Sequence, residues 1–219
     1  MTATDAPAPF DPYRLGRSRV DDPALGHGAG GPADKRVIVA YGFWIFLLSD
    51  IVMFSAFFAS YAVLSGNTNG GPSGRTLFDL HNVVAETACL LISSFTCGMA
   101  SIAASARNKL AFYAAMAVTF VLGLGFISLE VQEFVSLIQA GNGPSRSAFL
   151  SAFFALVGCH GAHVSAGLLW LLTMIAQVFA KGFRPEILRR ILCFSLFWHA
   201  LDIIWVAVFT VVYLIGVTQ

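Results

Sequence analysis

Residues 37–64 read VIVAYGFWIFLLSDIVMFSAFFASYAVL, an apolar run in which Asp50 is the only charged side chain. An α-helix rises about 1.5 Å per residue, so about 20 apolar residues suffice to cross the roughly 30 Å hydrocarbon core of a bilayer. This run is longer than that minimum and therefore predicts a membrane-spanning helix.

Four further runs of the same character follow, and each is separated from the next by residues that break or charge the chain. The predicted spans are residues 37–64, 82–106, 110–139, 149–180 and 191–217. The predicted breaks are a Gly-, Asn-, Ser- and Pro-containing stretch at 65–73, a charged turn at 107–109, the Gly-Asn-Gly-Pro sequence at 141–144 and a basic loop at 181–190.

The composition of the whole chain agrees with a membrane protein. Hydrophobic residues make up 57% of the 219 residues and charged residues only 11%, whereas soluble domains average about 25% charged residues. This composition excludes an ordinary soluble enzyme, a disordered chain and a nucleic-acid-binding protein. The predicted fold class is an all-α integral membrane protein with five transmembrane helices.

The N-terminal residues differ from the rest. Five of the eight prolines lie in the first 35 residues, which hold few apolar side chains. We expect residues 1–36 to form a flexible polar cytoplasmic tail and residues 37–217 to form the transmembrane domain. The tail lacks the layout of a cleaved signal peptide and is expected to remain in the mature chain.

Basic residues predict the orientation of the spans. Eleven of the 13 lysine and arginine residues lie before the first span, between the second and third, or between the fourth and fifth. Only Arg75 and Arg146 fall on the opposite side. The positive-inside rule therefore places the N-terminus in the cytoplasm and the C-terminus in the periplasm.

Several ionisable side chains lie inside the predicted spans, where such groups usually face the interior of a helix bundle. Three pairs have the i, i+3 spacing that places both members on one helix face. The candidate interior residues are Asp50, Glu86, Glu130, Glu133, His160, His163, His199 and Asp202.

Four interpretations of these residues remain open. The two histidines at 160 and 163 and the two acids at 130 and 133 have the spacing seen in di-metal helix bundles, although such sites combine Glu and His in one motif. A histidine pair on two helices can ligate haem, and interior acids can carry protons or ions. The fourth interpretation is structural, with acids and histidines joined by hydrogen bonds that hold the helices together.

Small residues suggest where helices approach one another. Ser93, Cys97, Ser101 and Ser105 recur every four residues in the second span, as do Gly158, Ala162 and Ala166 in the fourth. Both stripes predict close helix–helix contacts. The four cysteines form no CxxC pair and are expected to be packing residues.

Two motifs give the chain a family resemblance. Residues 153–164, FFALVGCHGAHV, and residues 197–205, FWHALDIIW, resemble the signature helices of subunit III of the haem–copper respiratory oxidases. Asp50 matches the buried carboxylate of that family, although the family often has Glu there. Glu130 and Glu133 match its acidic pair, and the histidines with Asp202 match its polar motif positions.

Within that family, the chain is most similar to the quinol-oxidising subgroup, the cytochrome o ubiquinol oxidases. The similarity rests on GGPSG at 70–74, GPSRS at 143–147, the run from 193 to 213 and the five-span length. The longer cytochrome c oxidase form has two additional helices, which border a lipid cleft. This chain has no counterpart of them.

The resemblance implies an accessory subunit of a proton-pumping terminal quinol oxidase in the bacterial inner membrane. Haems and copper are then expected in the partner catalytic subunit, subunit I, with no catalytic residue, metal or redox centre in this chain. The resemblance also implies other partner subunits and bound phospholipid. The alternatives are subunit III of a cytochrome c oxidase and, in a different class, a stand-alone transporter or proton channel.

Overall fold

The computed structural model describes residues 35–70 and 80–218, and within them the chain is helical. The long helices are α1 (Lys35–Leu64), α3 (Leu80–Ser105), α4 (Lys109–Gln139), α5 (Ala148–Lys181) and α6 (Pro185–Val208). A π-helical segment, η1 (Phe209–Leu214), and a short helix, α7 (Ile215–Thr218), continue α6. Except for its last two residues, which begin α1, the predicted tail lies outside the described residues.

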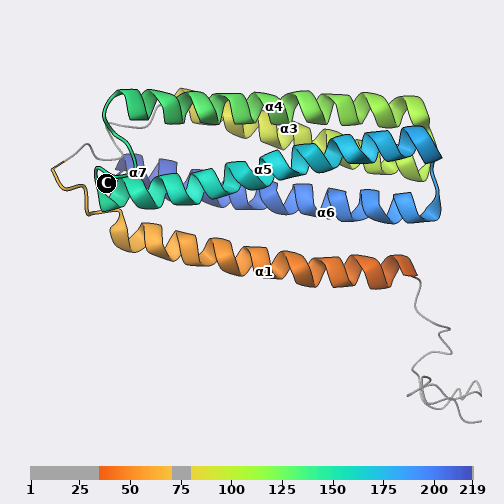
Figure 1. Cartoon of the computed structure of the whole chain (residues 1–219), viewed down its shortest axis with the longest axis horizontal. Coiled ribbons are helices and arrows are strands. Elements are labelled where there is room, and N and C mark those ends of the chain that lie inside the picture. The colour runs from red at the N-terminus through yellow and green to blue at the C-terminus, as the bar shows by residue number, and fades with distance from the viewer. Residues whose placement is uncertain (1–34, 71–79, 219) are drawn as a thin grey trace, which may run out of the picture.

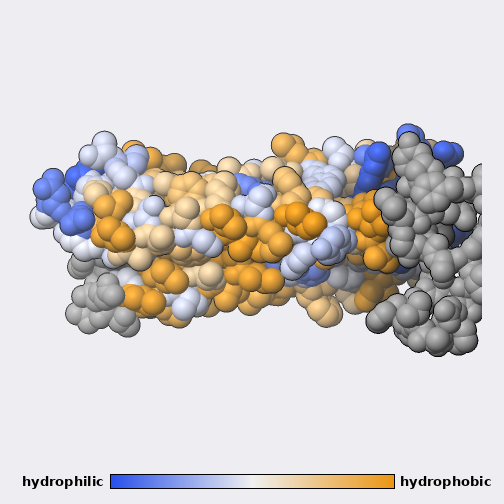
Figure 2. Space-filling model, turned by 90° about the horizontal axis from the view of Figure 1, so that it is seen from below, coloured by the Kyte–Doolittle hydropathy of each residue, from blue (hydrophilic) through white to orange (hydrophobic). Residues whose placement is uncertain are grey.

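The helices run alternately up and down in one elongated bundle (Figure 1). Five helices in the described residues are long and apolar enough to cross a membrane, which confirms the predicted number of spans. The start of α1, the α3–α4 turn and the α5–α6 loop lie at one end, and the C-terminus lies at the other. Hydrophobic side chains cover the middle of the bundle, with hydrophilic ones toward its ends (Figure 2).

The helix ends follow from the local sequence. The side chain of Asn108 caps α4 by accepting a hydrogen bond from the backbone N–H of Ala111, and Ser147 caps α5 by accepting one from Leu150, both at 3.2 Å. Gly141, with φ of +77°, follows the end of α4 in the left-handed region that glycine adopts readily. The turns predicted at 107–109 and 141–144 are therefore confirmed.

The prediction for the last loop was wrong. The predicted basic loop at 181–190 is reduced to three residues, because α6 begins at Pro185 rather than at residue 191. Arg184 is extended at the N-cap and Pro185 occupies the first helical turn, where its missing N–H costs nothing. Arg189 and Arg190 consequently lie on the first turns of α6.

Glycines allow three helices to approach closely around one indole ring. A Cβ atom at Gly123 of α4 would lie 3.1 Å from the Trp198 ring of α6, and one at Gly167 of α5 would lie 3.0 Å from the same ring. The indole nitrogen of Trp198 donates a hydrogen bond of 3.0 Å to the hydroxyl oxygen of Ser93 on α3. Trp198 thus connects α6 with α3, α4 and α5.

The two small-residue stripes differ in outcome. On α3, Ser93 and Cys97 are buried, and Ser93 contacts α6 as predicted. On α5, a Cβ atom at Gly158 would lie 3.5 Å from the ring of Phe134 on α4, whereas Ala162 and Ala166 are exposed. The predicted contact is therefore confirmed at Gly158 and wrong at the two alanines within this chain. The glycines next to that stripe, Gly161 and Gly167, make the close approaches instead, because they lie on the inward face of the same helix.

Helix α1 lies at the edge of the bundle (Figure 1). It packs mainly against α5 and α6. Many of its large apolar side chains are exposed, with Tyr41 at 67% and Val52 at 69%. The other four long helices form the more compact part of the molecule, with a core rich in Phe and Trp.

Candidate functional site

Three of the predicted interior acids lie together near the end of the bundle that carries the C-terminus. Glu86 of α3 is fully buried and Glu130 of α4 is 3% exposed. Glu86, Glu130 and Glu133 are close enough to interact electrostatically with one another. The hydroxyl group of Tyr213 in η1 donates a hydrogen bond of 3.0 Å to Oε2 of Glu133. We call these four residues the carboxyl cluster.

A glycine makes room for one of these acids. A Cβ atom built on Gly161 of α5 would overlap both carboxylate oxygens of Glu130 and would lie 2.7 Å from its Cδ atom. The absence of a side chain at Gly161 therefore allows the Glu130 carboxyl group to rest against the backbone of α5.

His160 is enclosed by aromatic rings next to this glycine. Its side chain is fully buried, and its ring centroid lies 5.2 Å from that of Trp205, 5.8 Å from that of Phe126 and 6.2 Å from that of Phe54. Neither ring nitrogen has a hydrogen-bond partner in the described part of the chain. His160 therefore does not form there the acid–histidine pair that the structural interpretation suggested.

The second histidine of this motif is oriented by its own helix. Nδ1 of His163 donates a hydrogen bond of 2.8 Å to the backbone carbonyl of Cys159, one turn earlier in α5. Its ring lies 5.2 Å from the ring of Phe54 on α1, so it also contributes to the α1–α5 contact. Asp50 of α1 is half-buried and lies near enough to Cys159 to interact with it electrostatically.

The remaining predicted pair, His199 and Asp202 on α6, faces α3. A hydrogen bond of 2.6 Å joins Nδ1 of His199 to the hydroxyl group of Ser94. Asp202 lies beside the same two residues. A further bond of 3.1 Å runs from the indole nitrogen of Trp205 to the hydroxyl oxygen of Thr87. Together with Trp198 and Ser93, these contacts form a ladder of polar bonds between α3 and α6.

The sequence analysis missed several residues that complete these arrangements. Tyr213 lies in an apolar run and gave no signal, because only the π-helical turn brings its hydroxyl group to Glu133. Gly161 was missed because the interpretation of this motif considered only the histidines on either side of it. Ser94 could have been found, since it lies on the same helix face as Thr87 and Ser101.

The metal and haem interpretations gain no geometric support. Among the residues that the structure describes, no three His, Cys, Asp or Glu side chains are grouped so as to hold a metal ion. His160 lies among aromatic rings, while the hydrogen bonds of His163 and His199 hold them to α5 and α3.

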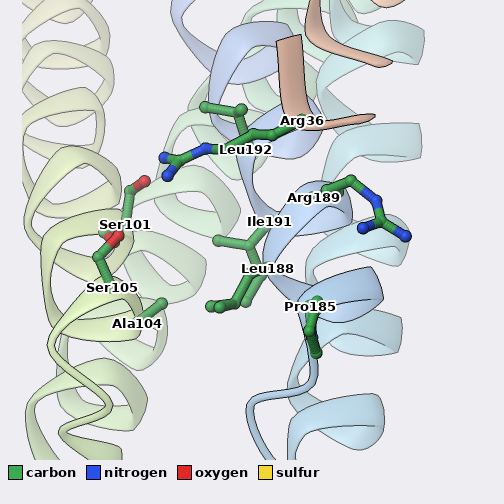
Figure 3. A pocket seen from close by; sticks show the side chains of 9 residues that line it. All are labelled: Arg36, Ser101, Ala104, Ser105, Pro185, Leu188, Arg189, Ile191 and Leu192. Atoms are coloured by element: carbon green, nitrogen blue, oxygen red, sulfur yellow. The ribbon is translucent and has the colours of Figure 1, made fainter. Parts of the chain in front are cut away.

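A polar pocket lies at the other end of the bundle. A cavity of about 250 Å³ lies between α1, α3 and α6, lined by Arg36, Ser101, Ser105 and Arg189 together with apolar residues. Figure 3 shows the side chain of Arg36 reaching from α1 toward Ser101, while the guanidinium group of Arg189 points the other way. Arg36 also borders an apolar groove of about 430 Å³ that includes Tyr41, Trp44 and Leu196.

Comparison with known proteins identifies the family. Residues 28–217 match the family model described as cytochrome c oxidase subunit III. The chain is 50% identical to cytochrome bo(3) ubiquinol oxidase subunit 3 of Pseudomonas aeruginosa, over 92% of this chain and 97% of the relative. It is 42% identical to quinol oxidase subunit 3 of Bacillus subtilis, over 80% of this chain and 86% of the relative. The predicted resemblance is confirmed: the chain, a multi-pass membrane protein, belongs to the cytochrome c oxidase subunit III family.

Proposed function

We propose that this chain is the accessory subunit III of a proton-pumping quinol oxidase in the bacterial inner membrane. It packs against the catalytic subunit, subunit I, which carries the haems and copper, and it stabilises that subunit. The observation that carries the proposal is the similarity along almost the whole chain to relatives named as subunit 3 of ubiquinol oxidases. The eight interior acids and histidines then serve structure or proton chemistry rather than redox chemistry.

The exposed apolar surface of α1 supports a role inside a larger complex. Apart from its contacts with α5 and α6, this helix presents large apolar side chains outward. In a membrane such a surface is covered either by acyl chains or by neighbouring helices. We assign this role to lipid and to partner subunits of the oxidase.

The pocket at the basic end supports lipid binding. The guanidinium group of Arg36 and the hydroxyl group of Ser101 line this pocket, and groups of both kinds bind phosphate. The adjoining groove, lined by Tyr41 and Trp44, is apolar and suits an acyl chain. An anionic phospholipid with its headgroup in the pocket would use both surfaces, and Arg36 borders the two.

The proposal is tested by isolating the chain from its native membrane in mild detergent. We expect larger haem- and copper-bearing chains to co-purify with it and the preparation to oxidise quinol with oxygen. The same preparation assayed with reduced cytochrome c distinguishes the cytochrome c oxidase alternative. Stoichiometric haem or copper in the separated chain would contradict the accessory role.

The buried acids and histidines also favour a second candidate, a stand-alone transporter or proton channel. This candidate predicts proton flux in liposomes that contain only this chain, and loss of that flux in Asp50→Asn or Glu130→Gln. Absence of flux from the wild-type chain, together with co-purification of haem-bearing chains, would reject it.

A further inference from the structure

The accessory role does not explain why two acids of the carboxyl cluster, Glu86 and Glu130, are buried inside the bundle. Glu86 approaches the acidic pair of α4 from a different helix, α3, and its side chain is fully buried. Neither of its oxygens has a hydrogen-bond partner in the described residues, and Oε2 of Glu130 has none there either. Buried polar atoms nearly always have a hydrogen-bond partner, so we expect these three oxygens to bind a group that donates or accepts hydrogen bonds.

Within residues 35–70 and 80–218, the groups around Glu86 and Glu130 bring little positive charge. Among the described residues, the titratable groups that interact with them are Glu133 on α4 and Tyr213 on η1. His160 of α5 directly precedes Gly161, against which the Glu130 carboxyl group rests. In the loop after α4, the guanidinium group of Arg146 donates a hydrogen bond of 3.2 Å to the carbonyl oxygen of Gly141. His160 is surrounded by aromatic rings, and neither of its ring nitrogens has a hydrogen-bond partner among the described residues, so it pairs with neither acid there.

These surroundings decide the charge state of the two acids. Burying an ionised carboxylate costs several kcal/mol unless a cation compensates it. A second carboxylate nearby raises that cost further. Burial and the neighbouring carboxylate therefore both favour the uncharged form of Glu86 and Glu130.

An uncharged carboxyl group still needs hydrogen bonds, because it donates through its O–H and accepts at both oxygens. The protein supplies none to Glu86 among the described residues. A buried water molecule typically makes about three hydrogen bonds to such groups. The space against the backbone of Gly161 keeps the Glu130 carboxyl group beside α5, where its unpartnered oxygen can share such water with Glu86.

We propose that Glu86 and Glu130 form a buried proton-holding site between α3 and α4, in which both carboxyl groups are uncharged and bind internal water. Each carboxyl group passes its O–H proton to a bound water molecule and accepts another proton from that water at its second oxygen, so both groups remain uncharged. The exchange moves no net charge. The Tyr213–Glu133 bond borders the site on the side of η1.

The test uses infrared difference spectra of the purified oxidase complex, comparing wild type with Glu86→Gln and with Glu130→Gln. We expect each variant to lose one carbonyl-stretching band of a protonated carboxyl group. Glu186→Gln is the matched control, because Glu186 is an exposed acid in the first turn of α6. It should lose only a carboxylate band. Loss of a carboxylate band in Glu86→Gln would overturn the proposal.

Exchange into D2O tests the water-binding half of the proposal. The two protonated-carboxyl bands should shift in D2O, since internal water exchanges with solvent. Bands that stay unshifted after prolonged incubation would refute water access to the site.

The yield of assembled complex provides an independent measurement. Gln has nearly the shape of an uncharged Glu, so Glu86→Gln should assemble to within about twofold of wild type. Failure of Glu86→Gln to assemble, while Glu186→Gln assembles normally, would also contradict an uncharged Glu86.

Discussion

The hydroxyl group of Tyr213 donates a 3.0 Å hydrogen bond to the carboxylate of Glu133 and so connects η1 with α4. The two residues are 80 positions apart in the sequence. A π-helical turn is wider than an α-helical turn and often occurs at functional sites. Here it contributes a buried tyrosine to a cluster of acids whose other members come from α3 and α4.

Removing this hydroxyl group should destabilise the protein. Tyr213 is fully buried, so Tyr213→Phe deletes a hydrogen bond to a carboxylate where water does not readily replace it. We expect a loss of about 1–3 kcal/mol, measured as a lower thermal midpoint of the complex. Tyr41→Phe, at a tyrosine that is 67% exposed, is the control and should leave the midpoint unchanged. Equal midpoints for the two variants would show that the bond contributes nothing.

Gly161→Ala should displace Glu130. The added methyl group overlaps the carboxyl group that rests against α5, so either the side chain or the helix must shift. Such overpacking costs about 1–3 kcal/mol. Gly125→Ala in α4 is the matched control, because a Cβ atom there has no neighbour within 4 Å. Comparable thermal midpoints for the two alanine variants would contradict the described position of Glu130.

Ser94→Ala should weaken the contact between α3 and α6. The substitution removes the 2.6 Å hydrogen bond to Nδ1 of His199 in a half-buried position. We expect a cost of about 0.5–1.5 kcal/mol in thermal or denaturant unfolding of the complex. Ser128→Ala serves as the control, since that exposed hydroxyl group donates its hydrogen bond to the carbonyl oxygen of Leu124 in its own helix. A larger effect in the control would refute the prediction.

Asp50→Ala should loosen the complex or its bound lipid. Asp50 lies half-buried on α1 and faces α5 near Cys159. Its loss removes an electrostatic interaction from α1, the long helix that packs least against the rest of the described chain. The measurements are the fraction of complex that survives detergent and the lifetime of turnover. Ser49→Ala, at an exposed residue whose hydroxyl group bonds to Phe46, should match wild type. Wild-type assembly and lifetime in Asp50→Ala would argue against an interior role.

The proposed orientation predicts which loops a membrane-impermeant thiol reagent can reach. Ser145, in the turn after α4, and Lys109, the first residue of α4, are exposed and lie at opposite ends of the bundle. In cells with a permeable outer membrane, the reagent should label Ser145→Cys but not Lys109→Cys. The wild-type chain, whose four cysteines lie within the long helices, provides the background. Labelling of Lys109→Cys alone would reverse the proposed orientation.

The sequence predicted the number and approximate extent of the long helices, because length and apolar character alone define a membrane span. It placed the start of the last helix too late, at residue 191 rather than Pro185. The charged residues Arg189 and Arg190 suggested a loop, but Pro185 favours a helix start, and α6 therefore begins before them. It also could not predict the π-helical segment, since FTVVYL carries no local signal for a wider turn.

The partners of the candidate residues were harder to predict than their positions. The i, i+3 spacing predicts that Glu130 and Glu133 share one face of their helix. Their other neighbours come from α3 and η1, distant segments whose packing the pattern does not encode. Likewise, the stripe of Gly158, Ala162 and Ala166 gave the spacing of a helix contact but not its direction. The inward face of α5 is defined by Gly161 and Gly167, whose neighbours are Glu130 and Trp198.

The position of α1 at the edge of the bundle has a consequence for biosynthesis. The N-terminal helix leaves the ribosome first, whereas its main packing partners, α5 and α6, leave it last. Between these events α1 must remain in the bilayer with both its apolar surface and Asp50 in contact with lipid or with another inserted protein. The order of the helices in the sequence therefore creates an interval during synthesis. In that interval a partner subunit can bind α1 before α5 and α6 are made.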